Sequence, residues 1–420
     1  MQPKQYTNPV YIFFLVLPYG MSFGFVSVAL PYLLTHKGFS VATTAAIVSL
    51  GVSANIWRFI WGPIADLTLS LRRWYWIGVI SCFVTLILLC SISYNTKATT
   101  FLAVIVFISQ VAATFVVLPV GGFMANSIEE HKKGRASGWY QAGNLGGTGL
   151  GGGAGLWLAT HYSIFIAGIV ISISMLVFAA VVMLIQDVKS NKQQTVLKEM
   201  KLMGKDFVKM LRVPVILFVM IMLILPIGTG AASNLWSAIA TDWKVDADTV
   251  ALVTGIISGL VSAIGCVIGG FIADRWGNWV AYLGAGTVCA LVTIIMAAMP
   301  YQPAIYIGGV LVYAFGLGLL NAAFSAVILF AIGTKGASTK YSLLSSIGNI
   351  PVVYMTTFDG WAHDKSGSKF MLTAEALVGI VFVIICIVVL KWMHKRKMLK
   401  KPLEEAMEIS GDVYTAVRPL

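Results

Sequence analysis

The sequence predicts an all-α membrane protein whose twelve transmembrane helices form two six-helix bundles. Three observations carry this prediction. Of the 420 residues, 58% are apolar and only 11% are charged, whereas soluble proteins carry roughly a quarter charged residues. Apolar runs of spanning length recur along the chain, and Lys and Arg are concentrated in alternate loops. So few charges could not cover a core this apolar, and the outer surface must therefore face lipid.

Each predicted span has the length that a bilayer requires. A spanning helix needs about 20 mostly apolar residues, because the hydrocarbon layer is about 30 Å thick. The first apolar run is longer than the core of a signal peptide and no polar domain follows it, so we expect it to be retained. Twelve segments meet the criterion, at residues 10–34, 41–64, 74–93, 100–125, 136–160, 164–186, 214–240, 249–273, 279–299, 303–331, 341–362 and 371–393.

The distribution of basic residues tests this count and orients the chain. With the amino terminus in the cytoplasm, 23 of the 29 Lys and Arg residues fall in inner segments, five fall in outer loops and Arg58 lies within a span. This asymmetry predicts that both termini are cytoplasmic. It also attributes the net charge of +12 to membrane topology, so we expect no nucleic-acid partner.

A long polar segment divides the chain into domains. We predict an amino-terminal bundle at residues 1–186, a cytoplasmic linker at 187–213, a carboxy-terminal bundle at 214–393 and a cytoplasmic tail at 394–420. The Lys-rich linker fits an amphipathic helix lying along the membrane surface. A plain flexible linker is the alternative.

A short motif recurs at matching places in the two halves, the arrangement expected of a rocking transporter. Gly62-Pro63-Ile64-Ala65-Asp66 ends the second span, and Gly270-Phe271-Ile272-Ala273-Asp274 ends the eighth. Glycine permits close helix approach, and the aspartate can engage a neighbouring helix end or arginine in one conformation. A helix-terminating charge cluster is the alternative. We predict that the following residues control conformational change: Asp66, Arg72, Arg73, Asp274 and Arg275.

The motif of the eighth span carries a family resemblance. The segment Gly270-x-x-x-Asp274-Arg275-x-Gly277-Asn278 resembles the cytoplasmic loop motif of the major facilitator superfamily. The resemblance extends over the whole chain and implies the major facilitator fold and secondary transport by alternating access. The first-half copy departs from the pattern, because Leu-Thr-Leu-Ser-Leu separates Asp66 from Arg72.

A narrower resemblance concerns two short stretches. Arg58-Phe-Ile-Trp61-Gly-Pro63-Ile-Ala-Asp66, followed by Arg72-Arg73-x-Trp, is similar to the group of muropeptide permeases, acetyl-CoA transporters and siderophore permeases. Glu130-x-x-x-x-Arg135-Ala-Ser-Gly adds a looser match. The resemblance implies uptake of a muropeptide, a siderophore or a similar compound with an acidic group across the inner membrane. A drug or amphiphile efflux pump of the same superfamily is the alternative.

Arg58 is the most informative single residue. It lies about 9 Å inside the cytoplasmic end of the second span by helical rise. A charge at that depth is costly and usually faces a cavity or a partner. We predict that Arg58 binds an acidic group of the substrate; snorkelling, or pairing with Glu129 or Glu130, is the alternative.

Other polar residues within spans are predicted to line the substrate path, because amide side chains facing lipid are costly. Hydrogen bonding between helices is the alternative for each. The substrate-path residues are Tyr19, Gln110, Gln141, Asn144, Asn234, Trp236, Asn321, Asn349 and Tyr354. Asp359 and Glu375 are candidates for proton coupling, since a buried carboxyl group can take up and release a proton. Hydrated positions near the interface are the alternative that we favour for these two carboxylates.

The fifth span carries glycines at every fourth position, namely Gly143, Gly147, Gly151 and Gly155. Such a stripe lets another helix approach closely. We predict that it packs between the moving bundles, and that leucine at Gly147 or Gly151 jams or unfolds the protein.

Several functions are not expected. The chain has no Ser-His-Asp arrangement, no His-Glu-x-x-His and no nucleotide-binding loop, so we predict neither an enzyme nor an ATP-driven pump. Its five cysteines form no Cys-x-x-Cys pair, and Asp359 with His363 would supply only two ligands, so we predict no metal and no cofactor. The expected partners of this monomer are a small-molecule substrate, the lipid bilayer and, as a candidate, protons.

Overall fold

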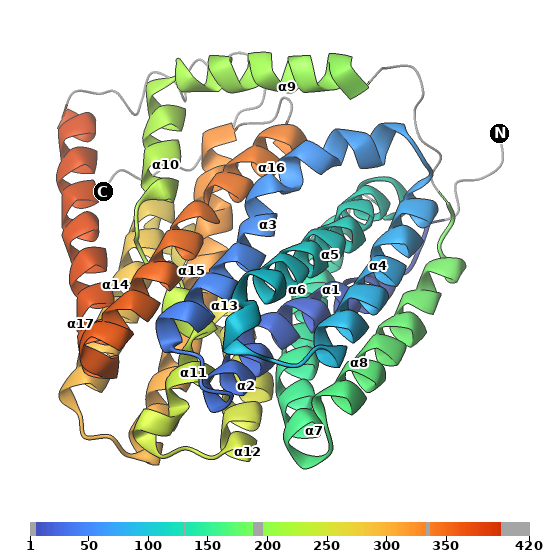
Figure 1. The fold of residues 1–420 in the computed structure, drawn as a ribbon. Coiled ribbons are helices and arrows are strands. Elements are labelled where there is room, and N and C mark those ends of the chain that lie inside the picture. Colours follow the sequence, from blue (N-terminus) through green and yellow to red (C-terminus); the bar gives the residue numbers. More distant parts are fainter. Residues whose placement is uncertain (1–5, 130–131, 188–195, 333–336, 396–420) are drawn as a thin grey trace.

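The computed structural model describes residues 6–129, 132–187, 196–332 and 337–395, and the regular elements within these ranges are all helices. Figure 1 shows α9 (Val196–Leu211) lying across one end of the molecule, with both described chain ends on the same side. We call this end the linker face and the other end the opposite face. Lys4, Glu130, Lys335 and the predicted tail beyond residue 395 lie outside the described residues.

The first half consists of six helical rods. Breaks and wide turns divide several of them into shorter elements. In chain order they are α1 (Val10–Gly24), η1 (Phe25–Ala29) and α2 (Leu30–His36); α3 (Val41–Leu67); α4 (Leu71–Ser91); η2 (Thr96–Ala98) and α5 (Thr99–Ser127); α6 (Lys133–Gly149), η4 (Leu150–Ala154) and α7 (Gly155–His161); and α8 (Ile164–Ala179) with η5 (Ala180–Leu184).

The second half follows α9 and is less regular. Its first rod is interrupted, and its last two rods are joined in one helix that folds back at Ser366 and Gly367, where the backbone is not helical. In chain order the elements are α10 (Pro214–Ile224), η6 (Ala231–Asn234), α11 (Trp236–Ile239) and η7 (Ala240–Trp243); α12 (Ala247–Val250), η8 (Ala251–Ile257) and α13 (Ser258–Trp276); α14 (Asn278–Ala298); α15 (Pro303–Ile332); α16 (Ala337–Ile347); and α17 (Ile350–Lys395).

Length and hydropathy alone identify nine candidate membrane spans within the described residues. The predicted fifth and seventh spans are not among them, and the eleventh and twelfth are joined as one candidate, Leu343–Met393. The fifth span is helical but rich in glycine and polar residues, because it faces other helices more than lipid. The seventh is interrupted after Ile224, where Pro226 is followed by positive φ angles at Gly228 and Gly230.

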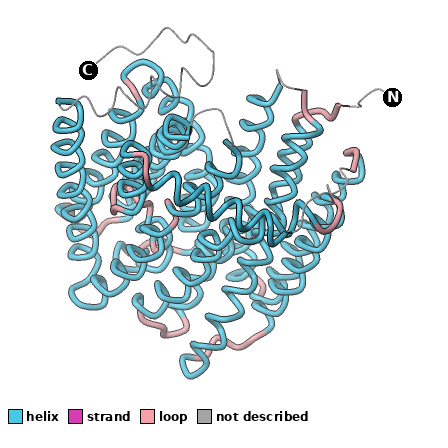
Figure 2. The backbone as a smooth tube through the Cα atoms, turned by 90° about the horizontal axis from the view of Figure 1, so that it is seen from above, coloured by secondary structure: helices cyan, strands magenta, loops and turns pink. Residues whose placement is uncertain are grey.

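The lipid-facing surface is visible as apolar stripes on the outer helices. On α13, large side chains with more than half of their surface exposed recur at Leu260, Ile264, Val267 and Phe271. Their spacing of three or four residues places them on one side of the helix. Figure 2 shows the helices of both halves from the linker face. Such a surface requires a bilayer around it.

The glycine ladder of the fifth span packs against α1, which belongs to the same half. A Cβ atom on Gly143, Gly147 or Gly151 would lie 2.4, 2.6 or 1.9 Å from the carbonyl oxygens of Phe13, Leu17 and Met21, respectively. Both series advance by four residues, so the two helices run in register with their backbones in contact. The close packing agrees with the sequence, but the expected location was wrong, because the ladder does not lie between the two bundles.

A second set of glycines lies between the halves. A Cβ atom on Gly255 of η8 would lie 2.6 Å from the Cα of Gly153 in η4, and one on Gly153 would lie 2.6 Å from the Ala251 carbonyl oxygen. On the other flank, Gly360 of α17 packs against Ala45 of α3. These contacts all fall in the half of the molecule nearer the opposite face, and we call them the opposite-face seam.

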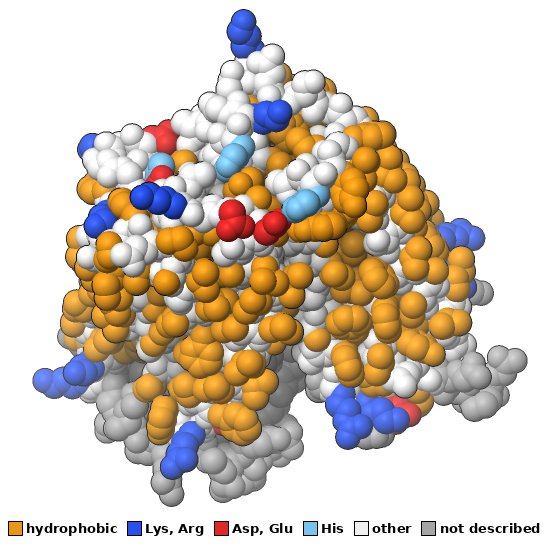
Figure 3. All heavy atoms as spheres, turned by 90° about the horizontal axis from the view of Figure 1, so that it is seen from below, with side chains coloured by type: hydrophobic (Ala, Val, Ile, Leu, Met, Phe, Trp, Pro, Cys, Tyr) orange, Lys and Arg blue, Asp and Glu red, His pale blue; other side chains and the backbone are white. Residues whose placement is uncertain are grey.

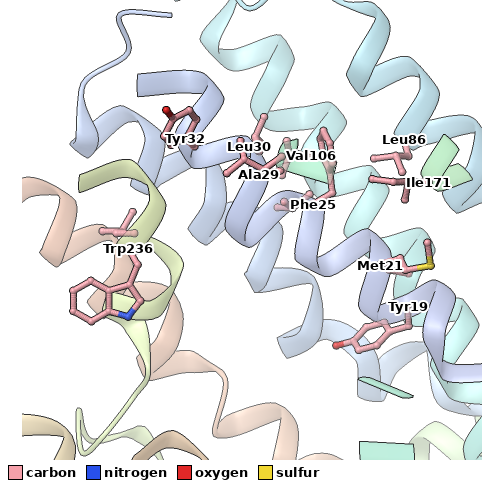
Figure 4. Close-up of a cluster of buried hydrophobic side chains, with 14 of the residues drawn as sticks. Tyr19, Met21, Phe25, Ala29, Leu30, Tyr32, Leu86, Val106, Ile171 and Trp236 are labelled. Atoms are coloured by element: carbon pink, nitrogen blue, oxygen red, sulfur yellow. The ribbon is translucent and has the colours of Figure 1, made fainter. Parts of the chain in front are cut away.

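Apolar packing continues across the seam. One cluster of buried side chains extends from Tyr19 in α1 and Phe25 in η1 to Trp236 in α11 and Trp243 in η7. Figure 4 shows Tyr19, Phe25 and Leu30 along the first rod, with Trp236 presented by the second half. The two halves therefore share a core on this side of the molecule.

Candidate functional site

Arg58 lies where the two halves meet on the linker side of the seam. It is half-buried in α3, and its guanidinium donates a hydrogen bond to Ser345 Oγ of α16 at 3.3 Å. Electrostatic interactions connect the guanidinium with the phenols of Tyr19 and Tyr140. Glu129, one of the expected alternative partners, forms an ion pair with Lys132 at 3.0 Å. Arg58 therefore bridges the halves and lies within electrostatic range of the phenols of Tyr19 and Tyr140.

Four further residues complete this site, and none of them was predicted. Asn55, one helical turn before Arg58, accepts a hydrogen bond from the Tyr19 hydroxyl at 3.2 Å. Tyr140 of α6 interacts electrostatically with Tyr341 of α16, whose hydroxyl is 3.2 Å from Ser325 Oγ. The pattern that could have identified them is spacing: Asn55 is three residues from Arg58, and Tyr341 is four residues from Ser345. The Arg58 site is defined as Tyr19, Asn55, Arg58, Tyr140, Tyr341 and Ser345.

The predicted path residues separate into two groups. Gln141 and Asn321 are exposed and Asn144 is half-buried, which is compatible with a hydrated path. The others use their polar groups to join helices or to pair within their own helix, and Trp236 is buried against Tyr306 and Tyr313. The hydrogen bonds run from Gln110 to Ser22 at 3.3 Å, from Asn234 to Thr356 at 3.0 Å, from Tyr354 to the Ile224 carbonyl at 2.7 Å and from Asn349 to the Ser345 carbonyl at 2.8 Å.

Asp359 and Glu375 are both buried, with 0% and 9% of their surface exposed. The favoured expectation that they are hydrated interface residues was wrong. Both belong to α17, on the two legs that meet at the Ser366 break, and they interact electrostatically with each other. Neither carboxylate oxygen of Asp359 has a hydrogen-bond partner within the described chain.

Glu375 has one fixed partner. Its Oε1 accepts a hydrogen bond from the Tyr313 hydroxyl at 3.1 Å, and the main chain of Ala232 also hydrogen-bonds it. Its Oε2 has no partner within the described residues. A small pocket beside it is lined by the interrupted seventh rod, including Pro226 and Thr229. The break in the seventh rod therefore places main-chain polar groups and a small pocket beside the Glu375 carboxylate.

The repeated loop motifs lie on the linker face. Asp66 is in the last turn of α3, while Asp274 and Arg275 in the last turn of α13 are exposed, as is Arg73. Arg72 donates from its backbone N–H to Asp187 Oδ1 at 3.1 Å and from its guanidinium to the Ile185 carbonyl. It thus ties α4 to the end of the sixth rod, within one half.

The glycines of these motifs do not have the expected role in this conformation. No atom of the described chain would lie within 4 Å of a Cβ atom on Gly62 or Gly270. Close approach of α13 occurs instead at Gly265 and Gly269, which pack against α15. Gly62 and Gly270 therefore make no close helix contact in this conformation with the part of the chain that the structure describes.

We expect Gly255→Val to weaken the opposite-face seam, because its side chain would enter the space held by Gly153. Overpacking of this kind costs about 1–3 kcal/mol, equivalent to a shift of about 5- to 150-fold in the balance of two conformations. Spin labels at Lys37→Cys and Lys365→Cys, on opposite halves, should report a longer distance. Gly284→Val, with no described atom within 4 Å of its Cβ, should leave the distance unchanged.

The fold and these sites define a polytopic membrane transporter rather than an enzyme. The family model for the Major Facilitator Superfamily matches residues 12–356, and the chain belongs to this superfamily. A search of curated proteins finds no match. The predicted fold class, two six-helix bundles of the major facilitator type, is confirmed by the family match together with the likeness to solved transporters.

Three solved structures illustrate the likeness. A variant of the nucleoside transporter NupG shares 13% identity over 91% of this chain and 99% of its own, with a TM-score of 0.70. A D-xylose-proton symporter shares 13% identity over 90% and 96%, with a TM-score of 0.67. A POT family transporter in complex with a thioalcohol-conjugated peptide shares 12% identity over 93% and 96%, with a TM-score of 0.71. Identities this low establish the common fold alone.

Proposed function

We propose that this protein is a proton-coupled uptake transporter for an organic solute with an acidic group, of the muropeptide or siderophore kind. The single observation that carries the proposal is Arg58, a cation within a span that bridges the two halves and lies within electrostatic range of phenols. A guanidinium presents several donors suited to a carboxylate or phosphate. Hydroxyl groups beside it can donate further hydrogen bonds to such an anion.

The position of Arg58 links binding to conformational change. Within the part of the chain described, its guanidinium makes one hydrogen bond, which crosses from α3 to α16 and is long, at 3.3 Å. An anion that engages Arg58 competes with Ser345 and changes the contact between the halves. A ligand that interacts differently with two conformations shifts their populations. This site therefore supports alternating access around a bound anion.

The buried carboxylates support coupling to protons. Two ionised carboxylates in a desolvated interior repel each other, and a proton on one of them relieves that cost. Asp359 and Glu375 have this arrangement, with Tyr313 as the donor to one of them. One of the solved structures with this fold is a D-xylose-proton symporter, which is consistent with this proposal.

The topology completes the proposal. The Lys-rich α9 and both described chain ends share the linker face, and by the positive-inside rule this supports a cytoplasmic location for that face. The seam then lies toward the outer face of the inner membrane in this proposal. We propose that the protein acts as a monomer, because each half contributes to the Arg58 site of the same chain.

Uptake by cells expressing the protein tests direction and substrate together. Muropeptides and ferric siderophores are the panel, assayed with and without a protonophore. We expect accumulation of a member of the panel that collapses when the proton gradient is removed. Export of drugs or amphiphiles, with no uptake, would instead identify an efflux pump and overturn the proposal.

We expect Asp359→Asn and Glu375→Gln to separate coupling from transport. Either variant should lose accumulation against a gradient by about 10- to 100-fold, since proton transfer by one positioned group typically contributes that much or more. Solute counterflow, which needs no proton gradient, should continue. Asp248→Asn, a change at an exposed carboxylate of α12, serves as the control. Loss of counterflow in step with accumulation would show that the pair binds the solute or holds the fold instead.

A further inference from the structure

His363 lies between the buried carboxylates and the opposite face. It is four residues after Asp359 in α17, on the side of that residue that leads to the Ser366 break. Residues four apart on a helix have Cβ atoms about 5–6 Å apart and share one face. The imidazole is 16% exposed, whereas Asp359 is fully buried. His363 is therefore the closer of the two to the surface, on the helix that carries both.

The outer nitrogen of His363 is held by an acid. Its Nε2 is 3.0 Å from Asp242 Oδ2 in η7, and the same oxygen accepts a hydrogen bond from Ser368 Oγ. Asp242 is 32% exposed and so reaches the aqueous surface. Burial acts to raise the pKa of Asp242, but hydrogen bonds from His363 and Ser368 and the charge on His363 together lower it. The carboxylate of Asp242 therefore stays ionised beside the imidazole.

The second ring nitrogen of His363 makes no hydrogen bond within the described residues. This atom, Nδ1, is 3.6 Å from Asp364 Oδ1. Two lysines on the same helix are directed elsewhere, with Lys365 over the Trp361 ring at 4.8 Å and Lys369 over the Tyr301 ring at 5.2 Å. The charged groups around the imidazole are thus mainly acidic, on both η7 and α17.

We propose that His363, oriented by Asp242 and Ser368, carries protons between the opposite face and the buried pair Asp359 and Glu375. Neutral His363 takes one proton from water at this face and becomes an imidazolium ion beside Asp242. It then passes one proton to the Asp359 carboxylate and returns to the neutral form. The inference rests on the proton coupling proposed above, and it adds the residue through which the proton enters.

The opposite-face seam allows protons, but not the solute, to reach the buried pair from this side. Face-to-face packing of the halves on this side excludes the solute, because glycine backbones touch across it. A proton needs only hydrogen-bonding groups, and Asp242, His363 and Asp359 supply them from the surface inward. The opposite face can therefore stay closed to solute while protons exchange. Figure 3 shows histidine and acidic side chains on this face, together with several Lys or Arg side chains, between apolar flanks.

The test needs no solute, because the proton itself is the probe. The full chain in lipid nanodiscs is given a rapid acid jump, and the infrared band of protonated carboxyl groups is followed in time. Asp359→Asn and Glu375→Gln assign the part of the band that belongs to the buried pair. His363→Gln retains a donor toward Asp242 but cannot carry a proton, so it should slow protonation of the pair by about tenfold or more. The amplitude at equilibrium should not change.

The fold offers a matched control. His161 lies on the same face, 3.7 Å from Asp248, but is remote in sequence from α17. His161→Gln should therefore leave the rate unchanged. Asp242→Asn retains the histidine and removes the acid that orients it. We therefore expect protonation of the buried pair at a rate between those of the wild type and His363→Gln. This variant replaces His363→Gln in the test if His363→Gln does not fold. Wild-type rates in both His363→Gln and Asp242→Asn would overturn the relay and leave the proposed coupling intact. Absence of any band assigned to the pair would overturn the coupling itself.

Discussion

Arg58→Ala is expected to abolish uptake while the protein remains folded in the membrane. The guanidinium is the anion-binding group of the proposed site, and its hydrogen-bond partner among the described residues is a single serine hydroxyl. Removing it costs the fold little, because no buried acid within the described chain is left without its ion-pair partner. Removing the guanidinium should lower the affinity for the substrate much more than it lowers the stability of the fold. Loss of one member of a hydrogen-bonded charge pair is worth about 2–5 kcal/mol, which corresponds to at least about 30-fold in affinity.

Two further variants sharpen this experiment. Arg58→Lys keeps the charge but loses the planar fork, so partial uptake with a raised KM is expected. Arg212→Ala removes an exposed arginine after α9 and should have no effect on uptake. Uptake is measured with the member of the panel that the wild type accumulates, and membrane expression by immunoblotting of the membrane fraction. Normal uptake by Arg58→Ala would show that this arginine only snorkels or braces α16.

The fold was predictable because lipid imposes a simple rule on sequence. A span must be apolar for about 20 residues, and most of the expected segments match helices within a few residues, such as 41–64 against Val41–Leu67. The predicted spans that differ from the structure are those in which a helix faces protein instead of lipid. The seventh rod is interrupted at Pro226 and the fifth is polar. Helices that pack against protein need not be apolar along their whole length, so hydropathy alone predicts them poorly.

The candidate site was only partly predictable, for a related reason. A charge within a span is conspicuous, so Arg58 stood out in the sequence. Its neighbours Tyr140, Tyr341 and Ser345 are ordinary residues there, and only the packing of α3, α6 and α16 brings them together. Burial of Asp359 was missed because its distance from the end of the span suggests water. The fold-back of α17 and the contact of Gly360 with α3 exclude that water.

Gly151→Leu is expected to prevent stable folding rather than to alter gating. Its Cβ atom would lie 1.9 Å from the Met21 carbonyl oxygen, a backbone atom that cannot turn away as a side chain can. The first and fifth rods would have to separate, and their paired register at Phe13, Leu17 and Met21 would be lost. Ordinary overpacking costs about 1–3 kcal/mol, and displacing one helix backbone from another should exceed this range. The measurement is the yield of monodisperse protein and its thermal midpoint in detergent.

An alanine series ranks the contacts of the ladder. The distances predict that Gly151→Ala is the most destabilising, followed by Gly143→Ala and then Gly147→Ala, at 1.9, 2.4 and 2.6 Å from a carbonyl oxygen. Gly138→Leu, on the same helix with no described atom within 4 Å of its Cβ, should fold normally. Because the ladder lies inside one half, its variants should change stability without changing the distance between labels at Lys37→Cys and Lys365→Cys. A longer label distance in stable Gly147→Ala would contradict this, since it would mean that the ladder acts on the contact between the halves.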